Sequence, residues 1–217
     1  MPRIARIIVD GCPHHITQRG NRRQQVFFSD DDYRTYLTLL AEWSKKAALS
    51  LWAFCLMPNH VHLVAVPKHA DSLHGALKET HRRYSWHINQ REKWRGYLWQ
   101  GRFASFPMDE AHAWRALRYV ENNPVRAGLA AKKEDWQWGS AAVRADTDNI
   151  WNSILCPLPP GLSDHDGPQC GETFENMLAL HEKSGLPLGN AAFVDQLETT
   201  FKRRLRPQNR GPRKKEG

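Results

Sequence analysis

The strongest constraint on the fold is a hairpin signal in the first half of the chain. A run of large apolar residues, Leu51–Met57, ends at the dipeptide Pro58-Asn59, and a second apolar run follows at His60–Val66. Proline presets one backbone angle and asparagine tolerates the left-handed region, so this dipeptide favours a turn. Two such runs separated by a two-residue turn signal predict an antiparallel hairpin.

The segments on either side of the hairpin alternate between strand and helix patterns. Apolar alternation marks the strands, and apolar spacing of three and four residues marks the helices. The last helix should end near Asn123, because Pro124 disfavours helical geometry in the residue before it. The expected elements are a strand at His14–Arg19, a helix from Ser29 to about Leu49, a helix from Leu73 to Ile88, a strand at Leu98–Phe106 broken by Gly101, and a helix from Asp109 to about Asn123.

This order of elements predicts an α+β fold. Strand, helix, two strands, helix and strand match the ferredoxin-like βαββαβ antiparallel sheet, here with an additional C-terminal helix and a basic tail. We expect a compact domain at residues 1–145, an irregular and helical extension at 146–201, and a disordered tail at 202–217. Weak helical patterns within the extension lie near Glu172–Leu180 and Phe193–Phe201.

The charge of the chain is concentrated at its end. The net charge is +8, and residues 202–217 hold eight lysines and arginines against one glutamate. Such a segment usually meets a polyanion, and nucleic acid is the first candidate, with a merely solubilising tail as the alternative.

Several classes of protein are excluded or disfavoured. The longest uncharged apolar run, Leu51–Met57, is far shorter than the roughly 20 residues that span a membrane, and no signal-peptide pattern follows the basic start. None of the four cysteines stands in a Cys-x-x-Cys pair, so free thiols in a reducing compartment are expected. We therefore predict a cytoplasmic protein without membrane contact.

Two histidines in the returning strand are candidate metal ligands. His60 and His62 would point to the same face of a strand, roughly 6–7 Å apart. Two imidazoles at this spacing can share a divalent ion. A structural or surface pair is the competing interpretation, and for His14 and His15, one of which faces the same side, we expect a structural role.

One tyrosine stands out among five. Only Tyr119 has a polar, metal-capable side chain four residues later, Asn123, and residues four apart share a helix face. A surface tyrosine of an amphipathic helix is the competing interpretation. The polar stripe of the predicted helix consists of His112, Arg115, Tyr119 and Asn122, and its apolar stripe of Ala113, Leu117 and Val120.

Taken in order, these motifs resemble the single-tyrosine HUH transposases, and most closely their REP-associated tyrosine transposases. The resemblance covers residues 3–143, and the last 20 or so residues more loosely. The chain departs from the family at Asn122, where an apolar residue is common, and residues 146–190 match nothing in it. The motifs are His14–Arg22, Trp99–Phe103, Pro58–Val64, Tyr119–Leu129 and Leu205–Pro207.

The resemblance implies an enzyme that cuts and rejoins single-stranded DNA beside hairpins, as a monomer or homodimer. Tyr119 would form a 5′-phosphotyrosine, and His60, His62 and Asn123 would hold Mg²⁺ or Mn²⁺. Basic and polar residues are candidates for DNA contact, although a solvated basic face explains those of the second helix equally well. They are Arg19, Asn21, Arg22, Arg23, Arg102, Lys78, Arg82, Arg83, Arg204 and Arg206.

Two other functions stay open at this point. One is hairpin-DNA binding without cleavage, and the other is a histidine-based metallohydrolase without a covalent intermediate. Formation of a phosphotyrosine adduct would distinguish an enzyme that cuts through Tyr119 from both of these alternatives. The sequence does not specify the DNA target, the oligomeric state or the role of residues 146–217. It also does not specify whether Tyr119 acts in its own subunit or in a partner subunit.

Overall fold

A four-stranded antiparallel sheet forms the centre of the protein. The computed structural model describes residues 6–159 and 172–206. The strands are β1 (His14–Arg19), β2 (Leu49–Met57), β3 (His60–Pro67) and β4 (Ala104–Pro107), in the spatial order β2-β3-β1-β4. All neighbours pair antiparallel. The predicted ferredoxin-like sheet and the hairpin at Pro58-Asn59 are both confirmed.

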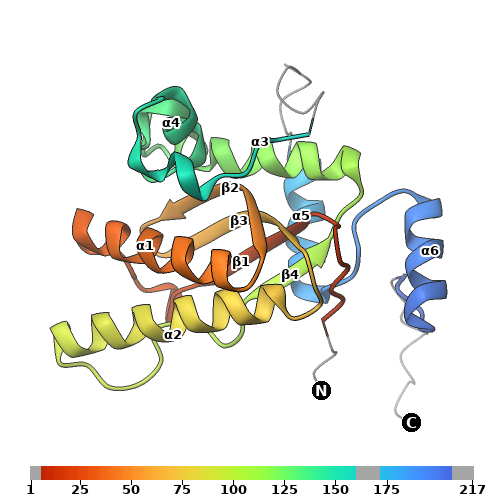
Figure 1. The fold of residues 1–217 in the computed structure, drawn as a ribbon, viewed down its shortest axis with the longest axis horizontal. Helices are drawn as coiled ribbons and strands as arrows, with labels where there is room; N and C mark the ends of the chain where they lie inside the picture. Colours follow the sequence, from red (N-terminus) through yellow and green to blue (C-terminus); the bar gives the residue numbers. More distant parts are fainter. Residues whose placement is uncertain (1–5, 160–171, 207–217) are drawn as a thin grey trace, which may run out of the picture.

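Helices cover both faces of this sheet (Figure 1). Helices α1 (Asp30–Lys46) and α2 (Ser72–Glu92) pack on one face, and α3 (Glu110–Arg126) crosses the other, with α5 (Glu172–Ser184) beside β4. The shorter α4 (Ser140–Ala145) and α6 (Ala191–Phe201) follow α3 and α5 respectively. Within the described ranges, no helix combines the length and apolarity needed to cross a membrane.

Strand alternation decides which side chains meet α3. Ile16 and Leu63 belong to the core under α1 and α2, whereas Val64 and Phe106 belong to the core under α3 and α5. Because neighbouring side chains point to opposite faces, His15 of β1 and the histidines of β3 share the α3 face. The site residues are thus placed by the same alternation that builds the two cores.

The start of α1 is held by a buried carboxylate. Ser29 and Asp32 form a capping box, and the Asp32 side chain accepts hydrogen bonds from the amides of Phe28 (2.8 Å) and Ser29 (3.2 Å). It is fully buried and pairs with Arg91 of α2. One side chain therefore joins the beginning of α1 to the end of α2.

Replacing this carboxylate should destabilise the fold. Asp32→Ala leaves two amides and Arg91 without their partner, so we expect the free energy of unfolding to fall by about 3 kcal/mol, measured by urea denaturation. Asp31→Ala is the matched control, because Asp31 is exposed and pairs only with Arg34. Asp31→Ala should change the free energy of unfolding by less than about 0.5 kcal/mol. Equal effects of the two substitutions would contradict this role of Asp32.

The strand predicted at Leu98–Phe106 is shorter than expected. Only Ala104–Pro107 pairs in the sheet, and before it Trp99 makes a single bridge to Gly20. Gly101 has a φ of +67°, which turns the chain out of strand geometry. Arg102 therefore lies exposed in a bend and not on a strand.

Helix α3 continues past the predicted end near Asn123, to Arg126, with Pro124 inside it. Pro124 has no backbone N–H, so it cannot donate the helical hydrogen bond to the carbonyl of Val120. The side-chain amide of Asn123 donates to the Tyr119 carbonyl (2.9 Å) and lies 3.5 Å from the Val120 carbonyl. This side chain compensates for the missing donor, and the helix is not interrupted.

The segment after α5 also differs in part from expectation. Helices α5 and α6 lie where the helical patterns predicted them. Leu205 is buried with Val194 and Leu197 of α6, and Arg206 pairs with carboxylates of that helix, so residues 202–206 are not the disordered segment that we expected. The remainder of the tail, 207–217, lies outside the described residues.

Candidate functional site

The histidine pair and the candidate tyrosine meet on the α3 face of the sheet. His60 and His62 follow the tight turn at the start of β3, and their ring centroids are 4.9 Å apart. Tyr119 of α3 lies above them, with its ring centroid 5.7 Å from that of His62. Residues 57 positions apart in the sequence are thus brought into contact by the packing of α3 on β3.

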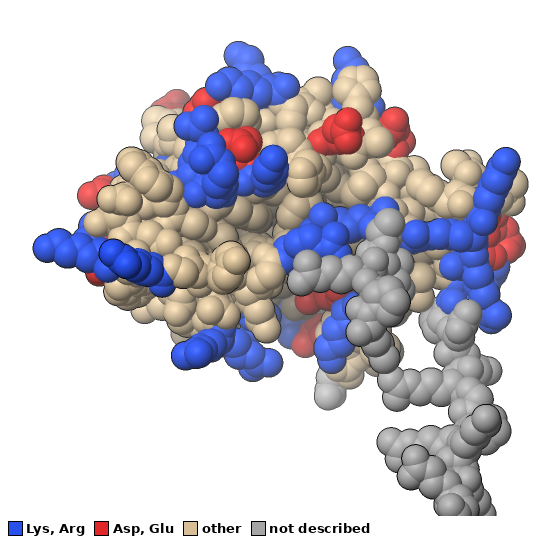
Figure 2. All heavy atoms as spheres, turned by 90° about the horizontal axis from the view of Figure 1, so that it is seen from below, with Lys and Arg blue, Asp and Glu red and all other residues tan. Residues whose placement is uncertain are grey.

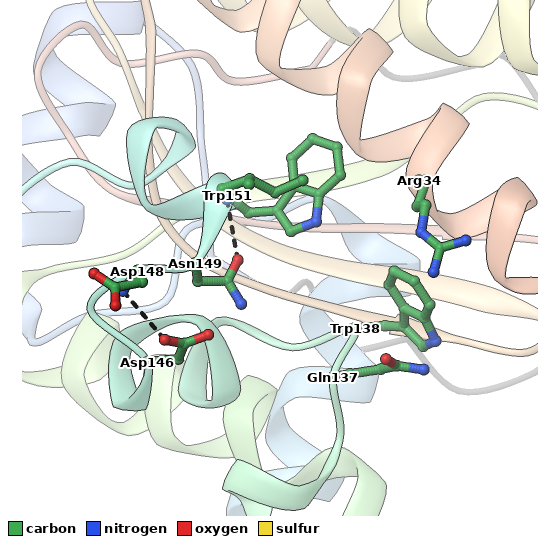
Figure 3. Close-up of a pocket in the computed structure, with 8 residues that line it drawn as sticks. Arg34, Gln137, Trp138, Asp146, Asp148, Asn149 and Trp151 are labelled. Carbon is green, nitrogen blue, oxygen red and sulfur yellow. Dashed lines mark hydrogen bonds between the residues drawn. The ribbon is translucent and has the colours of Figure 1, made fainter.

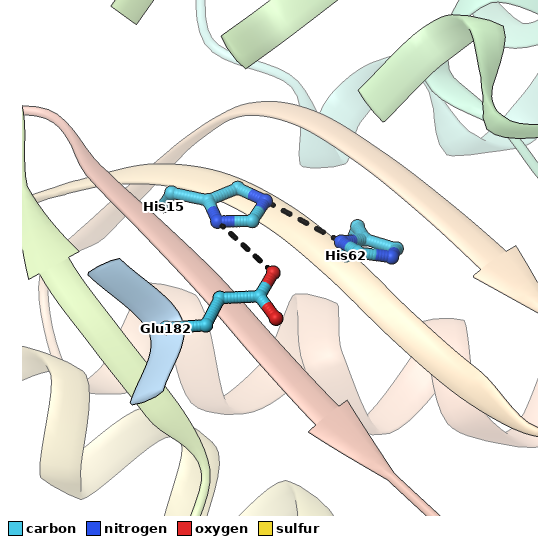
Figure 4. A group of neighbouring side chains, drawn as sticks. All are labelled: His15, His62 and Glu182. Atoms are coloured by element: carbon cyan, nitrogen blue, oxygen red, sulfur yellow. Dashed lines mark hydrogen bonds and ion pairs between the residues drawn. The ribbon is translucent and has the colours of Figure 1, made fainter. Parts of the chain in front are cut away.

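Two further side chains complete this group, and the sequence did not single them out for it. His15 of β1 stacks on His62 at 5.4 Å between ring centroids, and its Nε2 lies 3.3 Å from Nδ1 of His62. Glu182 of α5 reaches in from the side, with its carboxylate 3.7 Å from Nδ1 of His15 (Figure 4).

The two adjacent histidines of β1 have different surroundings. His14 has the expected structural role, because its Nδ1 bonds the Cys12 carbonyl and its Nε2 accepts from the Val9 amide. His15 is fully buried and lies among His62, Tyr119 and Glu182, within the candidate site.

Burial keeps the imidazoles of this site neutral at pH 7. It lowers the pKa of His60 to about 4 and that of His15 to about 3, and it holds the pKa of His62 well below its usual value. The neutral imidazole is the form that binds metal ions. Burial also raises the pKa of Glu182 to about 7.

The same surroundings make Tyr119 a weak nucleophile as it stands. Burial, and then the Glu182 carboxylate, raise the pKa of its phenol, while Arg126 and Arg19 oppose the shift. The Arg126 guanidinium lies 5.0 Å from the centre of the Tyr119 ring and pairs with Glu175 of α5. Added positive charge is therefore what would activate this phenol.

Asn123 lies one helical turn after Tyr119 and is nearly buried. Its amide nitrogen is engaged with the Tyr119 carbonyl, which leaves the side-chain oxygen for other partners. His60 bonds through Nδ1 to the Asn59 side chain. These contacts hold both residues at the edges of the site.

Four of the candidate DNA contacts border the site. Arg19 lies opposite His60 in the β1–β3 register. The 3-10 turn Asn21–Arg23 follows directly, and the Asn59 side chain donates to the carbonyl of Arg23 (3.1 Å), which joins this turn to the β2–β3 turn. Arg22 and Arg23 are exposed. The loop after β1 thus places exposed cations next to His60.

The other candidates for DNA contact lie elsewhere in the described structure. Arg82 and Arg83 belong to α2, on the opposite face of the sheet, where both pair with Glu79, and Lys78 is exposed on the same helix. Figure 2 shows the lysines and arginines of the lower face in separate groups with uncharged surface between them. Arg102 is exposed in the bend before β4, Arg204 is exposed after α6, and Arg206 is bound by Asp195 and Glu198.

A separate open pocket of about 290 Å³ lies between α1 and the segment after α3 (Figure 3). Its walls include Arg34, Trp138 and Trp151, and the Trp151 amide donates a hydrogen bond to the Asn149 side chain there. None of the site residues predicted from the sequence lines it.

Comparison with known proteins bears on the sheet and α3. The family model described as IS200-like transposase matches residues 8–123, which span β1 to most of α3 and include Tyr119. Glu182 lies beyond the matched region. No curated protein matches the chain.

Two solved structures match the chain. One is described as a REP-associated tyrosine transposase bound to a REP hairpin; it has a TM-score of 0.57 and 17% identity over 79% of this chain and 100% of that one, which shows a shared fold. A protein described as "a putative transposase" from Deinococcus radiodurans R1 has a TM-score of 0.37 and 25% identity over 56% of this chain and 97% of that one.

Proposed function

The chain belongs to the IS200-like transposase family, and from this premise we propose that it cleaves and rejoins single-stranded DNA beside hairpins through a covalent bond to Tyr119. The observation that carries the proposal is the contact of the Tyr119 ring with His62, at 5.7 Å between centroids, on the face where the histidine pair lies. A surface tyrosine of an amphipathic helix would have no reason to lie over the buried imidazoles of His15 and His62.

The chemistry that we propose needs one nucleophile. The phenol oxygen of Tyr119 attacks the scissile phosphorus, the bond to the 3′ oxygen breaks, and a 5′-phosphotyrosine and a free 3′-hydroxyl result. Overall the phenol loses a proton and the 3′ oxygen gains one. Attack by a 3′-hydroxyl on the phosphotyrosine reverses the step and joins strands. The bond energy is retained, in agreement with a sequence that contains no Gly-x-x-x-x-Gly-Lys-Ser/Thr loop.

The donor groups of the site fit a divalent ion. His60 and His62 are neutral at pH 7, and Nδ1 of the buried His15 has no hydrogen-bond partner. We propose Mg²⁺ or Mn²⁺ held by His60, His62 and Asn123, as the resemblance implies. Such an ion, when bound, withdraws negative charge from the scissile phosphate.

Two arginines of the chain add positive charge near the phenol of Tyr119. Arg19 and Arg126 both lower the pKa of Tyr119 against the effect of burial. We propose that Arg19, together with the exposed turn Asn21–Arg23, contacts DNA phosphates at the edge of the site. Because Tyr119 lies over His62 of its own chain, this arrangement supports cleavage within one subunit.

The hairpin partner is supported by the fold match. The solved structure that shares this fold is described as bound to a REP hairpin. We propose that this chain also recognises a hairpin in single-stranded DNA, with the cleavage site beside it. Palindromes near the gene are the first substrates to test.

Removal of metal tests this function. We would mix the protein with 3′-end-labelled single-stranded DNA that carries those palindromes, because the 3′ fragment is the one that stays on Tyr119. We expect a denaturant-resistant protein–DNA adduct with Mg²⁺ or Mn²⁺ and none with EDTA. An adduct in EDTA would contradict the metal requirement. Tight hairpin binding without an adduct under any metal would identify a hairpin-binding protein that does not cut.

A further inference from the structure

Helix α5 places the carboxylate of Glu182 beside His15, which in turn stacks on His62. We propose that Glu182 and His15 are positioning residues of the metal centre: the carboxylate fixes the proton of His15 on one ring nitrogen, and His15 thereby makes His62 present Nε2 to the ion. The ligands of the ion remain His60, His62 and Asn123, and the inference rests on the proposed function for the presence of that ion.

Both histidines of the β3 pair already use Nδ1 for another side chain. Nδ1 of His62 lies 3.3 Å from Nε2 of His15, and Nδ1 of His60 bonds to the side-chain oxygen of Asn59. The amide nitrogen of Asn59 donates to the Arg23 carbonyl, so its oxygen is the atom that faces His60. An amide oxygen only accepts, and the proton of His60 therefore lies on Nδ1. In both rings Nε2 is the atom left for the ion.

His15 faces a different partner with each of its ring nitrogens (Figure 4). Nε2 faces His62, and Nδ1 lies 3.7 Å from a carboxylate oxygen of Glu182. A neutral imidazole carries one proton, so one nitrogen donates and the other accepts. An ionised carboxylate only accepts and favours the proton of His15 on Nδ1. Nε2 of His15 then accepts the N–H of His62, and Nε2 of His62 keeps the lone pair that a metal ion needs.

The opposite order of protons would block the ion. A proton on Nε2 of His15 would be donated to Nδ1 of His62, and the proton of His62 would then lie on Nε2. Water does not decide between the two orders, because His15 is completely buried and His62 is 3% exposed. Nδ1 of His15 has no hydrogen-bond partner among the described residues. The Glu182 carboxylate that it faces is therefore the group that selects the order.

Packing of α5 aims Glu182 at His15. Phe174 and Leu178 are buried in the core under α3, and Glu182 follows at the same four-residue spacing. The stripe that faces the core thus ends in a carboxylate, where packing alone would favour an apolar side chain. Its separation from His15 exceeds a hydrogen bond by less than about 1 Å, which the flexible glutamate side chain can close when the ion binds.

The position of the protons can be measured in the metal-free protein. We would label the full chain with nitrogen-15 in its imidazoles and read the long-range proton–nitrogen couplings of each ring by nuclear magnetic resonance. Burial raises the pKa of Glu182 to about 7, so the spectra are recorded at pH 8, where the carboxylate is mostly ionised. We expect His15 and His62 both to carry the proton on Nδ1, and Glu182→Leu to move the proton of His15 to Nε2.

Mn²⁺ affinity without DNA provides the second readout, with free Mn²⁺ followed by electron paramagnetic resonance. Loss of an outer-shell partner typically weakens metal affinity 10- to 100-fold, so we expect a loss of at least about tenfold in Glu182→Leu. Because Glu182 acts through His15, Glu182→Leu should have no further effect when His15→Phe is already present. The matched control Glu175→Gln removes a carboxylate of α5 that faces Arg126, and it should change the affinity less than about threefold.

A wild-type proton on Nε2 of His15 or of His62 would overturn the inference, and this result needs no variant to fold. Wild-type Mn²⁺ affinity in Glu182→Leu would overturn it as well. Failure of the proposed function is distinguishable: the expected protons in a protein that never forms a DNA adduct would refute only the cleavage. An adduct formed by a protein with the opposite order of protons would refute only the roles of His15 and Glu182.

Discussion

We expect Tyr119→Phe to remove the covalent protein–DNA adduct and to leave hairpin binding within about threefold of wild type. The substitution deletes only the phenol oxygen, so the ring keeps its contacts with His62 and His15. Loss of a nucleophile usually lowers the rate by several orders of magnitude, and we expect at least a loss of about a thousandfold. Adduct yield on a denaturing gel with 3′-end-labelled DNA measures it.

Tyr97→Phe is the control for this prediction. Tyr97 is 87% exposed and remote from the histidines in the sequence, so its loss should leave the adduct yield unchanged. An adduct that persists in Tyr119→Phe at wild-type yield would assign the nucleophile to another residue.

His62→Gln should lower the yield of the adduct by about a thousandfold, almost as much as Tyr119→Phe does. His62 is one of the proposed metal ligands, and its ring also contacts Tyr119. It is nearly buried, and a glutamine amide binds divalent ions more weakly than a neutral imidazole does. Adduct yield over a range of Mn²⁺ concentrations measures the effect, and excess Mn²⁺ should restore little of it.

His74→Gln provides the matched histidine control. His74 is exposed on α2, across the sheet from the site, and its replacement should change neither adduct yield nor metal dependence. Wild-type cleavage by His62→Gln would remove the histidine group from the mechanism.

The parts of the site that local periodicity governs were predictable from the sequence. The shared face of His60 and His62 follows from strand alternation, and the place of Tyr119 on α3 follows from helical spacing. The contact between them depends on the packing of α3 across β3, and for that the family resemblance was needed. The confirmed order of strands brings these two elements together.

Other features depend on contacts that no local pattern reports. Alternation could not tell which of the adjacent histidines in β1 faces α3, because the register was unknown. Glu182 lies in a segment without a recognisable motif and meets His15 only through the packing of α5. In the sequence Arg206 is one of many cations in a basic tail, but in the folded chain it pairs with two carboxylates of α6.

Mass spectrometry of the wild-type adduct tests the central claim most directly. The adduct formed with Mn²⁺ would be digested with nuclease and trypsin, and the peptide that carries the residual nucleotide would be identified. We expect the modification on the phenol oxygen of Tyr119, in the tryptic peptide Tyr119–Arg126. Modification of any other residue, or a stable hairpin complex without a modified peptide, would contradict it.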